Sequence, residues 1–355
     1  MSINGLTVDG VILEPESAAI ITTYKCTARC KDCCFDCSPK EKEMLTIDEI
    51  KKFIDEIAPL KSIKSVVWTG GECSILGKKL EEGIAYAKSK GKISRIVSNG
   101  SWSSGVEKDK IYLNELKSKG LAEINLSTGD NHQQFIPIEK VLTIAQAAVS
   151  VGLRVLISVE KTKFSKFSIE NLKEHPIYKK IKRDDKDTSL SLLSAAWVSF
   201  NSGSNYEYDE EAFIEKREGC DSLYNTIAIN PEKKLLACCG ITIRYIPEME
   251  IGILGEKPII DMYNVQKSDF MKQWIFTEGP INILRQVVEW EDTIEIPKFV
   301  HPCQACAYIY QTPEIIEVIE KNYHTIIERI TVKFYQKISF KGTFEKKLKA
   351  KAIQK

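Results

Sequence analysis

Thr22-Thr-Tyr-Lys-Cys26-Thr-Ala-Arg-Cys30-Lys-Asp-Cys33-Cys34-Phe-Asp-Cys37 places five cysteines in one short stretch, directly after an apolar run. Three thiolates spaced Cys-x3-Cys-x2-Cys can hold three irons of a [4Fe-4S] cube and leave the fourth iron open, because thiolate is the soft ligand that such clusters need. The spacing occurs in two overlapping registers, Cys26/Cys30/Cys33 and Cys30/Cys34/Cys37. The stretch therefore predicts an iron–sulfur site with one open position.

The residues before the cysteines favour the first register. Residues 18–24 are typical of a β-strand, and Cys26 then begins the loop at the C-terminal end of that strand. Open α/β sheets and barrels place their chemistry at this end of the strands. A structural zinc site remains the alternative, since clustered cysteines also serve zinc.

The composition is that of an ordinary globular chain without a targeting segment. The 355 residues carry 50 Lys plus Arg against 49 Asp plus Glu, a net charge of +1, which gives no indication of a nucleic-acid partner. Residues 1–15 lack the basic and apolar segments of a signal peptide, and no apolar run reaches the roughly 18 residues of an integral membrane segment. The 11 cysteines then indicate a reducing compartment, so we expect a cytoplasmic protein with metal-binding cysteines.

Six short β-branched runs alternate with helical stretches up to about residue 200. Such β/α units in series form a parallel sheet with helices outside it, so we expect an open doubly wound sheet or a partial barrel. Thr46-Ile-Asp-Glu49 predicts a capping-box start for the first helix, and Gly91, Gly120 and Gly152 are placed to end later ones. The expected strands are 18–24, 63–68, 93–98, 123–127, 154–159 and 190–198, and the expected helices are 46–58, 76–90, 107–119, 137–151 and 168–180.

Polar or glycine-rich loops follow three of these strands. Because the carboxyl ends of parallel strands meet at one edge of a sheet, we expect these loops to lie beside the cysteines. Gly70-Gly71 lets a backbone approach a ligand closely, and Glu72 supplies a carboxylate for an amino group or a ribose hydroxyl; a simple tight turn is the alternative. The three loops are Thr69-Gly-Gly-Glu72, Ser98-Asn-Gly-Ser-Trp102 and Ser127-Thr-Gly-Asp-Asn-His132.

A second group of cysteines follows the linker-like stretch 201–206. Residues 224–230 and 234–238 are typical of a hairpin, and Pro302-Cys-Gln-Ala-Cys306 is typical of a tight metal-binding loop. Neighbouring side chains of a strand point to opposite faces, so Cys238 and Cys239 are not expected to bind the same metal. One of the two thiols then has another role or lies in the core as a small apolar group. The candidate ligands of a second site are Cys220, one of the 238/239 pair, Cys303 and Cys306.

The chain ends in a predicted helix and a basic tail. Residues 313–334 have an amphipathic pattern, with Thr312 as N-cap and Pro313 at the first helical position. Residues 333–355 are rich in lysine, which predicts a solvated tail, with a peptide or membrane-surface contact as the alternative. The pattern divides the chain into β/α units (1–200), a cysteine-rich region (201–310) and a terminal helix and tail (311–355).

These motifs together resemble the radical S-adenosylmethionine (SAM) superfamily. Cys26-x3-Cys30-x2-Cys33 and Gly70-Gly71-Glu72 carry the resemblance over roughly residues 18–200, and the C-terminal cysteines resemble the SPASM or twitch auxiliary-cluster domains of enzymes that modify ribosomal peptides. Cys33-Cys-Phe-Asp-Cys-Ser-Pro39, the three loops and the Cys238–Cys239 pair resemble the peptide epimerases of the YydG type. The resemblance implies a partial (β/α)6 barrel of the radical SAM type, then a cysteine-rich auxiliary Fe–S domain and terminal helices.

The resemblance also implies a role for each candidate residue. In the superfamily the open iron binds the amino and carboxylate groups of SAM, and an electron from the cluster cleaves SAM to a 5′-deoxyadenosyl radical. Carried over to this sequence, Cys26, Cys30 and Cys33 hold that [4Fe-4S] cluster. The implied cofactor contacts are Gly70, Gly71, Glu72, Ser98, Asn99 and Ser127, and the implied ligands of an auxiliary [4Fe-4S] cluster are Cys220, Cys238, Cys303 and Cys306.

In the epimerases, the radical removes a peptide Cα hydrogen and a cysteine thiol returns one from the opposite face. By its position in the pair, Cys239 resembles that hydrogen donor. The resemblance thus implies conversion of L to D residues in a ribosomally made precursor peptide, with an electron donor such as flavodoxin or ferredoxin. Asp32 departs from the superfamily pattern, because many members of the superfamily carry an aromatic residue at this position. This departure leaves open which of the two cysteine registers binds the cluster.

Two other functions fit the same cysteines. A radical SAM thioether maturase of the sactipeptide or ranthipeptide type also uses a radical and auxiliary clusters, but its reactive thiol belongs to the substrate. A non-enzymatic zinc-binding scaffold would use the cysteines only as structural ligands.

Overall fold

The computed structural model describes residues 13–185, 189–200, 206–214, 219–238 and 244–353. Its first half is a run of parallel strands whose spatial order equals their order in sequence. A doubly wound sheet reverses its strand order at a switch point, and this sheet does not, so the predicted partial barrel of six β/α units is confirmed. The strands are β1 (Ser17–Ile21), β2 (Ser65–Thr69), β3 (Ile93–Ser98), β4 (Leu121–Thr128), β5 (Arg154–Lys161) and β6 (Leu190–Ala196).

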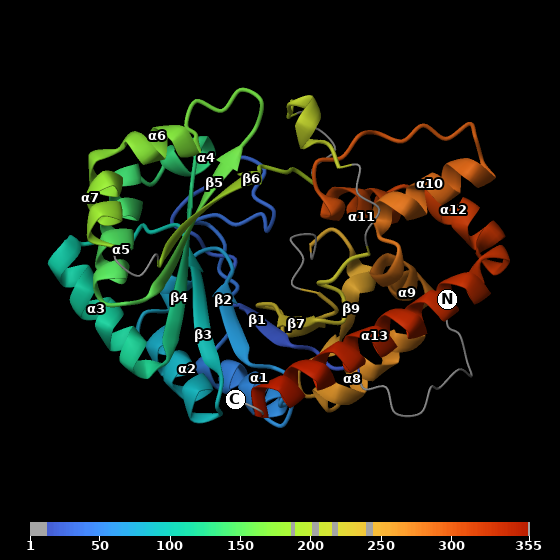
Figure 1. Ribbon diagram of the computed structural model, residues 1–355, viewed down its shortest axis with the longest axis horizontal. Helices are drawn as coiled ribbons and strands as arrows, with labels where there is room; N and C mark the ends of the chain where they lie inside the picture. Colours follow the sequence, from blue (N-terminus) through green and yellow to red (C-terminus); the bar gives the residue numbers. More distant parts are fainter. Residues whose placement is uncertain (1–12, 186–188, 201–205, 215–218, 239–243, 354–355) are drawn as a thin grey trace.

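Helices cover the outer face of this sheet (Figure 1). Buried and half-buried side chains alternate along β3 to β5, and the buried set, such as Ile96, Ile124 and Ile157, packs in the main core. The other face is the inner, concave one, which carries Asn125, Ser127 and Ser158. The helices of this half are α1 (Ile47–Ile57), α2 (Lys78–Ser89), α3 (Val106–Lys119), α4 (Asp130–Gln133), α5 (Ile138–Ser150), α6 (Ile169–Glu174) and α7 (Pro176–Asp184).

Three further strands extend the sheet beyond β1. β7 (Thr226–Ile229) pairs parallel with β1, and β8 (Lys234–Leu236) pairs antiparallel with both β7 and β9 (Glu250–Ile253). The predicted hairpin is therefore confirmed. The cysteine-rich region shares one nine-stranded sheet with the β/α units, in the order β6-β5-β4-β3-β2-β1-β7-β8-β9.

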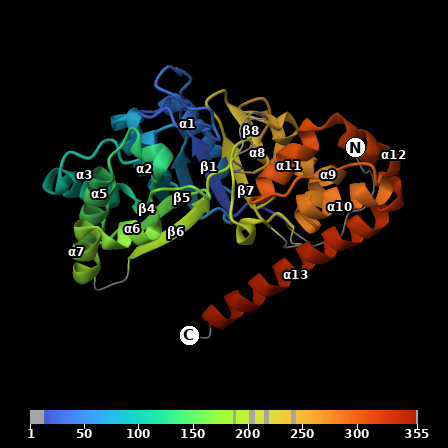
Figure 2. The ribbon, with the colours of Figure 1, turned by 90° about the horizontal axis from the view of Figure 1, so that it is seen from above.

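The rest of the chain is helical and gathers beyond β9 (Figure 1), with α13 running out from that group as a long rod (Figure 2). None of the helices in the described part of the chain combines the length and apolarity needed to cross a membrane. These helices are α8 (Ile259–Val265), α9 (Phe270–Thr277), α10 (Pro280–Trp290), α11 (Pro302–Gln311), α12 (Pro313–Asn322) and α13 (Ile327–Ile353).

Three expected helices and one expected loop differ from the structure. Pro176 divides the expected helix 168–180 into α6 and α7, because proline starts a new helix more easily than it continues one. The expected helix 76–90 begins only at Lys78, after the short 3-10 helix η1 (Cys73–Leu76), and the helix expected at 313–334 is interrupted at 323–326. The prediction of a tight loop at 302–306 is wrong, because these residues form the first turn of α11.

The two threonine N-caps form a matched pair for a stability test. The Thr46 hydroxyl accepts from Glu49 N at 3.2 Å, and the Glu49 carboxylate accepts from Thr46 N at 2.8 Å, which confirms the capping box. Thr312 caps α12 without such a side-chain bond. We expect Thr46→Ala to lower the free energy of unfolding by about 1 kcal/mol and Thr312→Ala to lower it by only a few tenths, measured by urea unfolding. Equal losses would contradict this assignment.

Candidate functional site

The Gly70–Glu72 turn is bonded, backbone to backbone, to the segment that leads into the cysteines. Gly71 N donates to Thr23 O at 2.7 Å, and Glu72 N donates to Lys25 O at 3.0 Å. A Cβ on Gly71 would lie 2.2 Å from Lys25 O, and a Cβ on Gly70 would lie 2.5 Å from Thr23 O. Side chains are therefore excluded at both positions, and the two glycines bring the two motif loops into contact.

The Glu72 carboxylate ties this turn to the loop after β3. Glu72 is fully buried, and its carboxylate accepts hydrogen bonds from Ser98 Oγ (2.9 Å), Asn99 N (2.8 Å) and Ser74 N (3.1 Å). Burial raises the pKa of Glu72, and the hydrogen bonds from Asn99, Ser74 and Ser98 oppose that rise. The carboxylate thus anchors the neighbouring loop, and its contact with a cofactor stays a prediction.

Asn99 continues this connection to the first cysteine. Its Nδ2 lies 3.5 Å from Cys26 Sγ and donates to Thr27 Oγ1 at 3.0 Å. Thr27 Oγ1 in turn donates to Ser101 Oγ at 2.8 Å. The structure therefore brings together Cys26, Gly70, Gly71, Glu72, Ser98 and Asn99, while Ser127 lies on the inner face of β4 in register with Ser158 of β5.

The cysteine loop gathers its thiols at the same edge of the sheet. Burial is the main cause that raises the pKa of Cys26 to about 11 and that of Cys30 to about 12, and negative charge on Cys33 adds to both shifts. Hydrogen bonds from the thiols of Cys34 and Cys37 lower the pKa of Cys33. The three sulfurs of the first register thus influence one another, and Cys33 also contacts the two remaining cysteines of the loop.

The four described C-terminal cysteines also lie close together. Burial raises the pKa of Cys306, and like charge on the other three predicted ligands adds to the rise. Cys303 and Cys306 are three residues apart in α11, so they share one face of that helix. The other two members of the group are Cys220 and Cys238; Cys239 lies outside the described residues.

The donor chemistry fits iron–sulfur ligation at both groups, because each offers several thiols, the soft ligands that such clusters need. Among the side chains that the structure describes, no three His, Cys, Asp or Glu residues form a preformed metal-ion site. Cluster binding places each thiolate on a separate iron, so it does not require such a site. Because thiols must lose their protons to become ligands, that binding is coupled to deprotonation of the buried cysteines.

Sequence reasoning picked out the loop that ends at His132 but missed the carboxylate that pairs with this imidazole at the same edge. His132 Nδ1 lies 2.6 Å from Glu160 Oε2, and the buried Glu160 also accepts from Asn131 N. The negative charge of Glu160 contributes to the raised pKa of Cys30, after burial and Cys33. Glu160 directly follows the expected strand 154–159, so its position after that strand was the available signal.

Arg244 is a second side chain that the sequence did not single out. Its Nη1 donates to Phe35 O at 3.0 Å, and its guanidinium carbon lies 4.3 Å from the ring centre of Tyr24. Tyr24 is buried, and its hydroxyl accepts from Asn230 Nδ2 at 3.2 Å. The guanidinium therefore holds the cysteine loop from the side of β8 and β9, through a contact 209 residues apart in sequence that no local pattern reveals.

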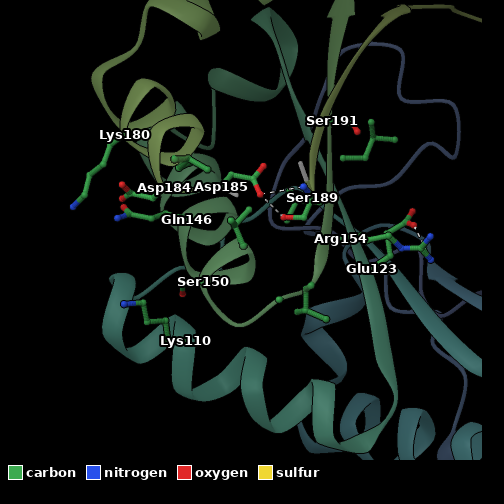
Figure 3. Close-up of a pocket in the computed structure, with 16 residues that line it drawn as sticks. Lys110, Glu123, Gln146, Ser150, Arg154, Lys180, Asp184, Asp185, Ser189 and Ser191 are labelled. Atoms are coloured by element: carbon green, nitrogen blue, oxygen red, sulfur yellow. Dashed lines mark hydrogen bonds and ion pairs between the residues drawn. The ribbon is translucent and has the colours of Figure 1, made fainter. Parts of the chain in front are cut away.

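A cavity of about 990 Å³ lies elsewhere, at the N-terminal end of β5 (Figure 3). Its charged lining is balanced, with Glu123 joined to Arg154 and with Asp185 bonded to Ser189 Oγ at 2.9 Å and Leu190 N at 3.1 Å. Asp185 thereby fastens the start of β6. We assign this cavity no catalytic role, because the cysteines and motif loops lie at the opposite ends of the strands.

The close approach at Gly71 gives a direct test of the motif junction. We expect Gly71→Ala to lower the free energy of unfolding by about 3 kcal/mol, because the added carbon meets a backbone carbonyl that has little room to move. Gly77→Ala is the control: a Cβ there meets nothing within 4 Å, and its cost of about 1–2 kcal/mol comes only from the strained backbone at φ 54° and ψ −125°. Urea unfolding measures both, and a smaller loss for Gly71→Ala than for Gly77→Ala would contradict the junction.

Comparisons with known proteins agree with this geometry. Residues 20–175 match the family model of the Radical SAM superfamily. The chain is 26% identical over 326 residues to YydG of Bacillus subtilis (strain 168), a protein whose name assigns it provisionally to peptide biosynthesis; the match covers 87% of this chain and 98% of YydG.

Solved structures show the same fold. The structure of native anSMEcpe with bound AdoMet is 13% identical, has a TM-score of 0.53, and matches 86% of this chain and 100% of its own. The same protein with AdoMet and the Cp18Cys peptide is 15% identical with a TM-score of 0.51, covering 86% of this chain and 99% of that one. The cysteine loop, the Gly-Gly-Glu turn bonded to it and the family match together identify residues 20–175 as a radical SAM domain, the type of domain that uses SAM and a [4Fe-4S] cluster.

Proposed function

We propose that the chain modifies a ribosomally made precursor peptide, and that the modification is the conversion of L to D residues. The similarity to YydG along nearly the whole length of that protein supports peptide biosynthesis as the setting. An electron donor such as flavodoxin or ferredoxin and a cytoplasmic location belong to the same proposal.

The contacts of the described residues around Cys239 carry the epimerase proposal. Leu236, on one side, packs in a small apolar cluster with Phe35 and Cys37 of the cysteine loop. Arg244, on the other side, donates to Phe35 O at 3.0 Å. The chain on both sides of Cys239 is therefore attached to the loop that holds the predicted cluster ligands. This attachment, together with the place of Cys239 in the Cys238–Cys239 pair, supports Cys239 as a thiol that serves the reaction.

The proposal gives each group a role. When bound, the cluster and SAM would supply a 5′-deoxyadenosyl radical able to take a hydrogen atom from a peptide Cα. Cys26, Cys30 and Cys33 would hold that cluster, and Gly70–Glu72 with Ser98, Asn99 and Ser127 would bind SAM. Cys239 gives its S–H hydrogen atom to the opposite face of the Cα, which inverts the centre. The sulfur radical left on Cys239 then needs one electron and one proton, which the external electron donor and solvent provide.

We assign the C-terminal thiols to an auxiliary [4Fe-4S] cluster, with Cys220, Cys238, Cys303 and Cys306 as ligands. After burial, negative charge on Cys220, Cys238 and Cys303 raises the pKa of Cys306, and this closeness of the four sulfurs supports the assignment. Reconstitution with iron and sulfide tests it, with about eight irons per chain expected for two cubane clusters. About four irons would contradict the auxiliary cluster, and a colourless protein holding only zinc would favour the scaffold alternative.

The stereochemical outcome is tested by isotope exchange. The reduced, reconstituted enzyme is incubated in D2O with SAM and candidate precursor peptides. Because thiol hydrogens exchange with solvent, we expect one deuterium at an inverted Cα, and no mass change for the same reaction in H2O. Mass spectrometry and chiral amino-acid analysis measure both. Unchanged mass in D2O contradicts epimerisation, and loss of two hydrogens in H2O indicates a thioether instead.

The donor is tested by Cys239→Ala. We expect this variant to bind its iron and to consume SAM but not to form D residues, because the Cα radical has no thiol to take hydrogen from. Cys73→Ala is the matched control, since Cys73 is buried with its thiol on Val97 O at 3.4 Å and is given no role in the reaction. Normal D-residue formation by Cys239→Ala would show that another group donates the hydrogen.

A further inference from the structure

Two aspartates in the cysteine loop adopt a left-handed backbone conformation. Asp32 has φ 55° and Asp36 has φ 50°, and they bracket the segment that carries Cys33 and Cys34. This conformation is unfavourable for any residue with a Cβ, although aspartate tolerates it better than most. A loop that contains two such residues keeps its shape only where surrounding contacts hold it.

Each of these aspartates accepts a hydrogen bond from a distant tyrosine. Tyr206 OH donates to Asp32 Oδ2 at 2.9 Å, and Tyr245 OH donates to Asp36 Oδ2 at 2.9 Å. The partners are 174 and 209 residues apart in sequence, and both tyrosines come from the chain beyond β6. The loop is therefore fastened from outside at its two strained positions.

The tyrosines themselves are held in place. Trp197 Nε1 donates to the Tyr206 hydroxyl at 3.2 Å, so that hydroxyl both accepts and donates. The Tyr245 ring packs against Phe200 with centroids 5.3 Å apart, and the neighbouring Arg244 donates to Phe35 O in the same loop. Both hydroxyls thus have fixed directions, which a positioning role requires.

We propose that Tyr206 and Tyr245 are positioning residues for the radical SAM cluster. By holding Asp32 and Asp36 in their left-handed conformations, they keep Cys33 directed toward Cys26 and Cys30. The inference rests on Cys33 as a cluster ligand and is independent of epimerisation. It also explains Asp32, because a residue with an acceptor side chain and a tolerance for positive φ is what this contact needs.

The two tyrosine–aspartate hydrogen bonds differ in their exposure to solvent. We therefore expect the loss of each bond to loosen the cysteine loop to a different extent. The Tyr206–Asp32 bond is partly buried, whereas the Tyr245–Asp36 bond is exposed to water that can replace it. In reconstituted enzyme we expect amide exchange in residues 32–37 to quicken about tenfold in Tyr206→Phe and about threefold in Tyr245→Phe. We also expect the midpoint potential and the EPR spectrum of the SAM-binding cluster to change in the double variant, because hydrogen bonding and exposure around the sulfurs tune both.

Tyr86→Phe is the matched control. Tyr86 OH also donates to an aspartate, Asp55, at 2.8 Å, but this pair joins α2 to α1 away from the cysteine loop. We expect no change in loop exchange or in cluster properties for this variant. Glycine adopts positive φ without strain. Asp32→Gly introduced into Tyr206→Phe should therefore recover most of the protection from amide hydrogen exchange that residues 32–37 lose in Tyr206→Phe.

The ligand premise is checked separately with Cys33→Ala. Retention of the full SAM-binding cluster by this variant would remove the premise and overturn the inference. If Cys33→Ala loses that cluster while Tyr206→Phe and Tyr245→Phe behave like Tyr86→Phe, the positioning role is overturned and the two hydrogen bonds are only surface contacts. Failure of the isotope test for epimerisation leaves all of these results interpretable, because none of them uses a peptide.

Discussion

The backbone bonds from Gly71 and Glu72 to Thr23 and Lys25 are the constraint on which the site depends. They hold the end of β2 against the segment that enters the cysteine loop, at a distance that only glycine permits. From this junction the Glu72 carboxylate accepts from the Ser98 hydroxyl and the Asn99 backbone N–H, and the Asn99 side-chain amide reaches Cys26. Three loops that are separate in sequence thus form one hydrogen-bonded unit around the buried Glu72 at the carboxyl edge of the sheet.

The second half of the chain completes this unit rather than standing apart from it. β7 pairs directly with β1, so the cysteine-rich region continues the sheet that carries the cysteine loop. Arg244, Tyr206 and Tyr245 then hold that loop from segments beyond β6. Negative charge on Cys303 also contributes to the raised pKa of Cys34, after hydrogen bonding to Cys33 and burial, so the two cysteine groups are neighbours.

Much of this arrangement could be predicted from local sequence. The series of β/α units, the Thr46 capping box and the gathering of Glu72, Ser98 and Asn99 follow from periodicity and from the rule that parallel strands end at one edge. The strand order of the partial barrel was implied by the family resemblance, because periodicity also allowed a doubly wound sheet. The loop expected at 302–306 was wrong because Pro302 starts a helix as readily as it marks a turn. The tyrosine and arginine contacts were missed because they join residues about 200 positions apart, and no local pattern carries such information.

The central claim is that Cys26, Cys30 and Cys33, held by this junction, bind the cluster that binds SAM. Anomalous diffraction at the iron edge from crystals of the reconstituted enzyme with SAM tests this claim most directly. The account predicts an iron cube bonded to these three sulfurs, with its fourth iron facing SAM beside Gly70–Glu72. A cube held by Cys30, Cys34 and Cys37, or zinc in place of iron, would contradict it.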